Sequence, residues 1–238
     1  MNYAFRLVII IILPTAVGLI VLAEPIVNVL FQRGEFNYLA TARTASALRW
    51  YASGLLFFGS LRVMVPAFYA LKNSLVPALA ALAALVANII SGLSFMGPTV
   101  SDAMPLITAW TRAFNPTGPM QHDGLALANT VSAFVNMVVL GVVLRRRVGR
   151  IGGRKIAKTA LQSGLACLLM AGAAWLIASR FQFTESGADP VRIAGLFAAI
   201  LAGGGVYFGA LALLDRKQAR NVWRLVTRRK GALPEEPV

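Results

Sequence analysis

Long apolar stretches alternate with short polar segments along the whole chain. Six of these stretches are long enough for a bilayer-spanning helix, which takes about 20 mostly apolar residues. Their approximate ranges are 1–31, 45–69, 76–96, 124–144, 159–179 and 191–214. The first stretch also has a signal-peptide interpretation, because Val21-Leu22-Ala23 is similar to a cleavage site. The apolar run continues from Pro25 to Phe31, which favours a retained transmembrane helix.

This pattern predicts an all-α, polytopic membrane protein of about six transmembrane helices. The composition agrees with it, since 58% of the residues are hydrophobic and 13% are charged. Soluble domains carry about 25% charged residues. The single cysteine, Cys167, lies in an apolar run, so we expect no internal disulfide, no metal site and no cofactor.

The positive charges set the expected orientation in the membrane. The net charge is +14, and the cations concentrate in two blocks, 145–158 and 215–230, which each follow an apolar run. Cytoplasmic membrane loops have this pattern, so we expect both termini in the cytoplasm and no nucleic-acid binding. The last block, 215–238, is expected to lie as an interfacial tail on anionic membrane lipids.

The third and fourth apolar stretches are separated by a polar, proline-containing segment near 97–123. Leu106, Ile107 and Trp110 recur at helical spacing in it, which is typical of a short helix on the membrane surface. His122 and Asp123 follow without a nucleophile or a second ligand, so we interpret them as loop residues. The spans hold no convergent acid, base or nucleophile either, and an enzyme is not expected. In the last stretch, Gly205-x-x-x-Gly209 predicts close helix packing.

A charge and a helix defect coincide inside the second apolar stretch. Arg62 precedes Pro66 by four residues, and proline has no N–H to bond the carbonyl of Arg62. Both features are costly in lipid unless protein or a water-filled cavity surrounds them. Two interpretations remain open for Arg62. It lines a polar cavity, or its side chain extends to the cytoplasmic headgroups about 10 Å away along the helix.

The surrounding sequence resembles the MurJ (MviN) family of lipid II flippases, which belong to the multidrug/oligosaccharidyl-lipid/polysaccharide exporter superfamily. The matching pattern is a basic residue, V-x-x-P, a small residue, F-Y, a short turn and a proline, carried by Arg62, Val63, Pro66, Ala67, Phe68, Tyr69 and Pro77. Two further segments are similar to the family: F-x-R-G-x-F, with Arg33, Gly34 and Phe36, and GLALANTVSAFVN, from Gly124 to Asn136. The family usually has an Arg-Gln-Asp turn and a threonine before the last proline, where this chain has Leu71, Lys72, Asn73 and Val76.

The resemblance implies that the chain corresponds to the last six of fourteen helices. Residues 1–144 would form four helices of the C-terminal lobe, with an outer loop inserted near 97–123. Residues 145–158 would be a basic cytoplasmic loop, and residues 159–214 a helix pair forming a groove for a polyprenyl tail. In the family, the central cavity is built mainly by the first two helices of each lobe, which lie upstream of this chain.

Three functions are compatible with these observations. The first is part of a lipid II flippase that moves undecaprenyl-linked peptidoglycan precursor across the bacterial cytoplasmic membrane, incomplete without a polypeptide supplying the N-terminal helices. Arg62 is then the candidate substrate-binding residue. The second is an exporter of another lipid-linked sugar or a drug in the same superfamily. The third is a non-transporting membrane scaffold or a truncated remnant.

Overall fold

The structure is a computed structural model that describes residues 2–96, 120, 122–148, 153–181 and 189–214. Its helices are α1 (Asn2–Val21), α2 (Ala23–Phe31), α3 (Tyr38–Ala70), α4 (Leu75–Met96), α6 (His122–Val148), α7 (Gly153–Ala178) and α8 (Pro190–Leu214). Within this part of the chain, six helices are long and apolar enough to cross a membrane, and only the short α2 is not. The prediction of an all-α polytopic protein is therefore confirmed. The inserted segment near 97–119 and the tail 215–238 lie outside the described residues.

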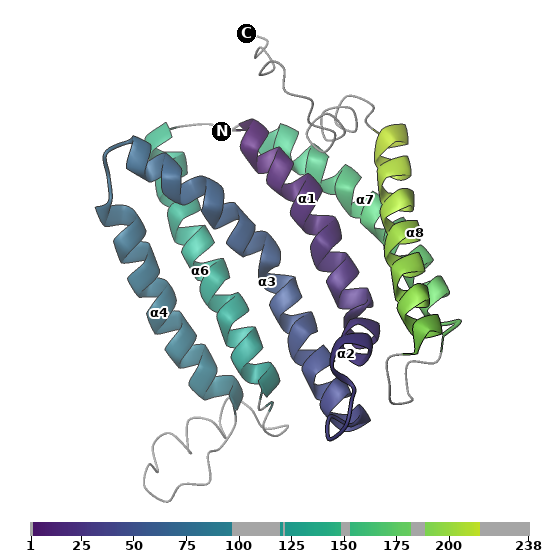
Figure 1. The fold of residues 1–238 in the computed structure, drawn as a ribbon. Helices are drawn as coiled ribbons and strands as arrows, with labels where there is room; N and C mark the ends of the chain where they lie inside the picture. The colour runs from purple at the N-terminus through teal and green to yellow at the C-terminus, as the bar shows by residue number, and fades with distance from the viewer. Residues whose placement is uncertain (1, 97–119, 121, 149–152, 182–188, 215–238) are drawn as a thin grey trace, which may run out of the picture.

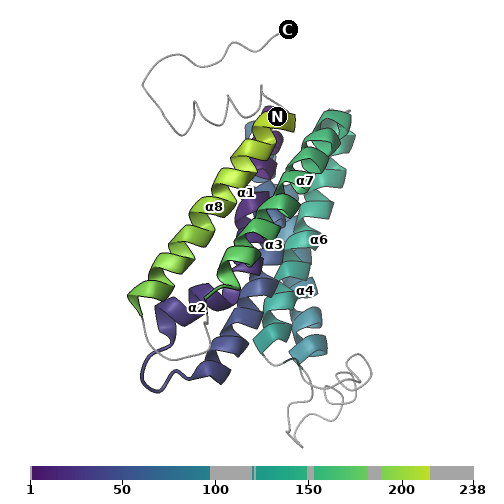
Figure 2. The same cartoon turned by 90° about the vertical axis from the view of Figure 1, so that its right-hand side faces the viewer.

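The helices pack side by side in an order that differs from their order along the chain. Going across the molecule the order is α4, α6, α3, α1, α7 and α8 (Figures 1 and 2). α6 packs against both α3 and α4, so these two consecutive helices barely touch. The start of α1 and the end of α8 lie at the same end of the bundle (Figure 1). Six long helices that alternate in direction along the chain place its two ends at the same end of the bundle in this way.

The first apolar stretch is divided into two helices, where the sequence predicted a single one. The break falls at Leu22, between α1 and α2. Pro25 lacks the N–H that would bond the carbonyl of Val21, four residues earlier. The flanking bonds persist, with Leu22 N–H donating to Gly18 at 2.9 Å and Ile26 N–H donating to Leu22 at 2.9 Å. α2 then packs on α3, through a cluster that includes Ala23, Val27 and Ala45.

Several helices extend beyond their predicted ends into polar sequence. α3 begins at Tyr38, because the side chain of Asn37 accepts the N–H of Ala40 at 3.0 Å and caps the helix. α6 continues through Arg145, Arg146 and Arg147, whose positive charges are favourable in the last turn. α7 begins at Gly153. The segment 145–158, predicted as a loop, is therefore largely helical outside 149–152, which the structure does not describe.

Small residues allow the central helices to approach closely. A Cβ at Gly54 would lie 2.7 Å from the Oγ1 of Thr130, and this hydroxyl donates to the carbonyl of Trp50 at 2.9 Å. This hydrogen bond joins α3 and α6. A residue larger than glycine at position 54 would collide with the Thr130 hydroxyl that makes it. At a second contact of α6, Ser132 donates to the carbonyl of Ala84 on α4 at 2.8 Å.

The predicted packing role of the Gly205-x-x-x-Gly209 pair was wrong for the described part of the chain. A Cβ at either position would meet no atom of the described residues within 4 Å. The tightly packed glycine of α8 is Gly203, whose Cβ would lie 3.4 Å from both Ala174 and Met170 on α7. The spacing of the motif identified the right helix but the wrong face of it.

Candidate functional site

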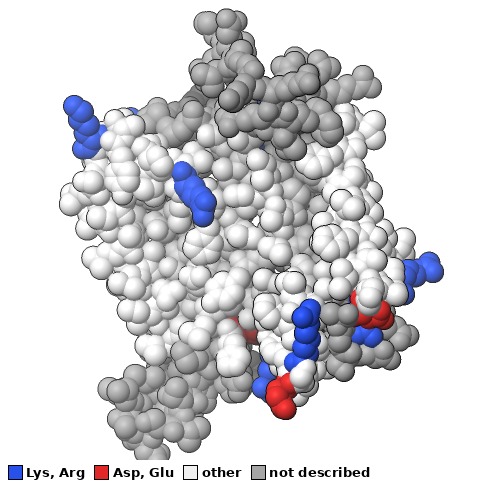
Figure 3. Space-filling model, viewed as in Figure 1, with Lys and Arg blue, Asp and Glu red and all other residues white. Residues whose placement is uncertain are grey.

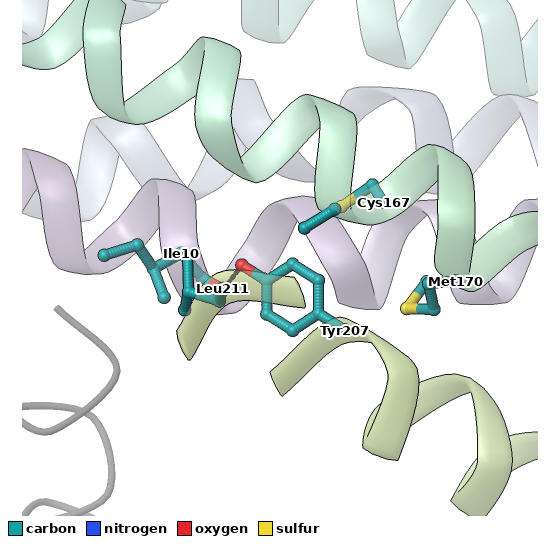
Figure 4. Close-up of a cluster of buried hydrophobic side chains, with 6 residues drawn as sticks. Ile10, Cys167, Met170, Tyr207 and Leu211 are labelled. Carbon is teal, nitrogen blue, oxygen red and sulfur yellow. Dashed lines mark hydrogen bonds between the residues drawn. The ribbon is translucent and has the colours of Figure 1, made fainter. Parts of the chain in front are cut away.

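An apolar groove of about 460 Å³ lies between α1 and α8, with α7 as its floor and α2 at one end. The lining at the α2 end includes Leu22, Ile26 and Ala199, and the lining at the other end includes Ile10 and Tyr207. The second group belongs to the buried cluster shown in Figure 4. Leu22 and Ala199 belong to another buried cluster, so the groove runs along the helices from one packed cluster to the other.

The two hydroxyl groups in the lining are both used within the protein. Thr15 donates to the carbonyl of Ile11 at 2.8 Å, one turn earlier on α1. Tyr207 donates to the carbonyl of Ile10 at 2.8 Å, from α8 to α1 (Figure 4). With its hydroxyls engaged and its other side chains apolar, the groove offers a hydrocarbon chain good packing and offers a sugar no hydrogen bonds.

The bond from Tyr207 replaces a helical bond that the sequence of α1 prevents. Pro14 lies inside α1 and has no N–H for the carbonyl of Ile10, four residues earlier. In a membrane such a carbonyl has no water to bond. Tyr207 is only 1% exposed, and its hydroxyl reaches this carbonyl from α8. Tyr207 thus supplies the donor that the Ile10 carbonyl lacks because of Pro14.

One stretch of α8 widens the groove. Gly203 packs against α7, while Gly204, the next residue, faces open space and also lines the groove. A side chain at Gly204 would meet no atom within 4 Å of its Cβ among the described residues. The absence of a side chain here therefore leaves volume for an occupant.

Arg62 does not line this groove. It is exposed on α3, as is Pro66, and α3 continues through Pro66 to Ala70. The residues around Arg62 on the inner side of α3, including Leu61 and Val63, pack on a separate buried cluster. The structure thus gives two distinct features, an apolar groove on one side of α1 and an exposed arginine on the potential membrane-spanning helix at its other side.

The F-x-R-G-x-F segment forms the turn between α2 and α3. Gly34 has φ +56°, a backbone conformation that favours glycine. The N–H of Phe36 donates to the carbonyl of exposed Arg33 at 3.1 Å, and its ring packs on the cluster that joins α2 to α3. Gln32 is 1% exposed and accepts the hydroxyl of Thr41 at 3.0 Å. The segment therefore forms a turn that is held by hydrogen bonds and in which the polar side chain of Gln32 is buried.

The P-A-F-Y segment ends α3 and positions α4. Phe68 is fully buried, while Tyr69 is exposed. The N–H of Asn73 donates to the carbonyl of Phe68 at 3.0 Å, and Lys72 between them has φ +54°, as the residue after a helix end often does. Pro77 is buried in the first turn of α4, where its missing N–H breaks no helical bond.

The third similar segment forms the first half of α6. Gly124 is buried near its start, and His122 and Asp123 lie in its first turn, so their prediction as loop residues was wrong. Asp123 accepts the hydroxyl of Ser46 at 2.6 Å, which fastens α6 to α3. Asn136 has a buried Oδ1 without a hydrogen-bond partner among the described residues.

The charged side chains of the described residues are sparse over the middle of the molecule. Figure 3 shows a wide uncharged band, with most blue and red atoms gathered toward the end that carries α2. There Tyr38 donates to Glu24 at 2.9 Å, and Arg49 lies 3.6 Å from the same carboxylate. Both partners of this ion pair are partly exposed, so it adds little stability. Within the described ranges, no group of three His, Cys, Asp or Glu side chains could hold a metal ion.

Sequence reasoning missed the contribution of α1 to the groove. The resemblance placed the groove in residues 159–214, whereas Ile10, Pro14 and Gly18 of α1 form one of its walls. It also missed Tyr207. The available signal was a proline in one apolar run and a single tyrosine in the last, because a freed carbonyl in a membrane needs a donor.

The fold and the groove define a polytopic helical membrane protein with an apolar groove between α1, α7 and α8. The family model described as lipid II flippase MurJ matches residues 1–187. The probable lipid II flippase MurJ of Bdellovibrio bacteriovorus is 31% identical over 214 residues, which cover 89% of this chain and 36% of that protein. The lipid II flippase MurJ of Burkholderia cenocepacia is 27% identical over 220 residues, covering 92% of this chain and 39% of that protein.

This chain belongs to the MurJ family. A third relative, the probable lipid II flippase MurJ of Vibrio cholerae, is 32% identical over 140 residues, which cover 59% of this chain and 23% of that protein. The chain thus spans roughly a quarter to two fifths of the length of the curated relatives it matches. The family name describes transporters and not catalysts of a chemical reaction.

Proposed function

We propose that this chain is the C-terminal part of a lipid II flippase of the bacterial cytoplasmic membrane, and that it is incomplete by itself. Its substrate is then the undecaprenyl-linked peptidoglycan precursor or a related polyprenyl-linked lipid. Membership of the MurJ family supports this function, and the share of the relatives that the chain spans supports a missing upstream part. The observation that carries the proposal is the apolar groove between α1 and α8.

The groove fits one half of what a flippase must do. A sugar-pyrophosphate headgroup needs a polar, cation-lined cavity that opens alternately to each side, while the polyprenyl tail stays in apolar surroundings. The groove has apolar walls and engaged hydroxyls, so it serves the tail. Arg62, exposed within a membrane-spanning helix, is our candidate for the headgroup side, where the upstream helices would complete a cavity. The basic tail would contact anionic lipids.

Filling the groove tests its role as the tail site. In the Gly204→Trp variant, the indole has room to occupy the groove without meeting the described protein atoms near its Cβ. We expect this variant to lose most of its cross-linking to a polyprenyl phosphate with a photoreactive group in the tail. The measurement compares cross-linking yields of purified protein in lipid nanodiscs.

The matched control is Gly205→Trp, the same change one residue along α8. Gly205 also has open space around its Cβ, but it does not line the groove. It should keep the cross-linking of the unchanged chain. Equal yields from both variants would place the tail elsewhere, whereas equal losses would point to a general effect of tryptophan on α8.

The proposed orientation has a direct test in labelling from outside the cell. Glu35 lies in the turn between α2 and α3, Ser74 lies in the turn before α4, and both are exposed. In a chain without Cys167, we expect Glu35→Cys to react with an impermeant thiol reagent in intact cells and Ser74→Cys to react only after the membrane is opened. The reverse result would place both termini outside the cytoplasm.

A further inference from the structure

α8 is held in the molecule mainly by α7, with much smaller contacts to α1 and to α2. It packs along α7, where Gly203 allows contact with Met170 and Ala174. Its contact with α1 is much shorter, because the groove separates the two helices over most of their length. Movement of α8 away from α1 at the end opposite α2 therefore breaks few contacts, and it can leave the packing on α7 and the small contact with α2 in place.

At the end of the groove away from α2, this short contact centres on one polar bond. The Tyr207 hydroxyl donates to the carbonyl of Ile10 at 2.8 Å, and the tyrosine ring lies in a buried cluster with Cys167, Met170 and Leu211 (Figure 4). Pro14 makes the acceptor available, because the carbonyl of Ile10 has no helical donor. The carbonyls of α1 on either side of Ile10 can bond within the helix, so a tyrosine at a neighbouring level of α8 would find no free acceptor there.

We propose that the Tyr207–Ile10 hydrogen bond is a latch that holds α8 against α1 and sets the closed end of the groove. When it opens, α8 moves from α1 about its packing on α7, and the groove widens toward the surrounding lipid. One neutral hydrogen bond is weak enough to open and close repeatedly, and a carbonyl tolerates loss of its partner better than an N–H does. The latch does not depend on which apolar molecule occupies the groove.

The distance between the two helices at the latched end is the quantity to measure. Spin labels at Tyr3→Cys on α1 and Leu213→Cys on α8 occupy exposed positions, at the same end of the bundle as the latch. Cys167→Ala, present in every sample, removes the native thiol. Double electron–electron resonance in lipid nanodiscs then gives the distribution of distances for residues 1–238 with and without the latch.

Tyr207→Phe removes the hydroxyl and keeps the ring. We expect the population at longer distance to rise by roughly threefold, the factor that corresponds to an average hydrogen bond between transmembrane helices. Tyr69→Phe, which removes a hydroxyl from an exposed tyrosine on α3, is the matched control and should leave the distribution unchanged.

Pro14→Ala provides an independent variant that removes a helix defect and so is expected to fold. The new N–H bonds the carbonyl of Ile10 within α1 and competes with Tyr207, so we expect a smaller shift in the same direction. If Tyr207→Phe does not yield folded protein, Pro14→Ala alone tests whether the hydrogen bond acts as a latch. If every folded variant of Tyr207→Phe and Pro14→Ala gives the same distance distribution as the labelled chain without these changes, the latch proposal is wrong. The bond then only satisfies the carbonyl of Ile10.

Discussion

Cells depleted of their own lipid II flippase are expected not to grow when residues 1–238 are the only replacement. The chain can insert and pack, since each span satisfies its own backbone. Transport needs two parts of a protein that move around a shared site, and this chain spans only about a third of the relatives it matches. A pyrophosphate without partners in the bilayer costs several kcal/mol. A deficit of about 4 kcal/mol alone slows crossing roughly a thousandfold.

Growth should return when a second polypeptide supplies the upstream helices. The control is that polypeptide expressed by itself, which should fail as the chain alone does. Membrane insertion of each part, measured by fractionation, separates loss of function from loss of protein. Full rescue by residues 1–238 alone would contradict the proposal and make the chain a minimal flippase, either as a monomer or as an assembly of copies. Failure of the combination as well would favour a scaffold or remnant without transport.

The membrane spans could be predicted from the sequence because their cause is local. A run of about 20 apolar residues must form a helix in lipid, whatever its neighbours are. Gly34 lies in a polar segment between two apolar stretches, where a turn is expected, and it adopts a positive φ there. The exact ends were less predictable. Asn37 caps α3, which therefore begins at Tyr38 and not near Ala45 as expected, and arginines after the apolar run continue α6.

The groove could not be predicted in the same way, because its walls come from distant parts of the chain. Ile10 and Tyr207 are 197 residues apart, and the hydrogen bond between them leaves no periodic signal in either segment. The spatial order of the helices is equally hidden, since apolar faces that contact lipid and apolar faces that contact helices have similar compositions. Glycine spacing illustrates the limit: Gly203 packs on α7, whereas a Cβ added at Gly205 or Gly209 would meet none of the described residues within 4 Å.

Replacing Arg62 by leucine is expected to cripple transport in the assembly with the upstream helices, while replacing it by lysine is expected to be tolerated better. Arg62 is exposed on α3, so in that assembly it can face a shared cavity. A hydrogen bond to a charged group contributes about 1.5–3 kcal/mol. Its loss should therefore slow lipid II transfer by roughly 10- to 100-fold. The measurement is growth after depletion of the native flippase, together with lipid II appearing on the outer face.

The order of the two variants identifies what Arg62 supplies. Lysine keeps a charge at nearly the same reach but loses the planar guanidinium, so tolerance of Arg62→Lys means that attraction to an anion matters most. Arg43→Leu, at another exposed arginine of α3, is the matched control and should transport normally. If Arg62→Leu also transports normally, its side chain serves only to reach the headgroups at the cytoplasmic surface. The headgroup site must then lie wholly in the upstream helices, and this chain contributes the groove for the tail.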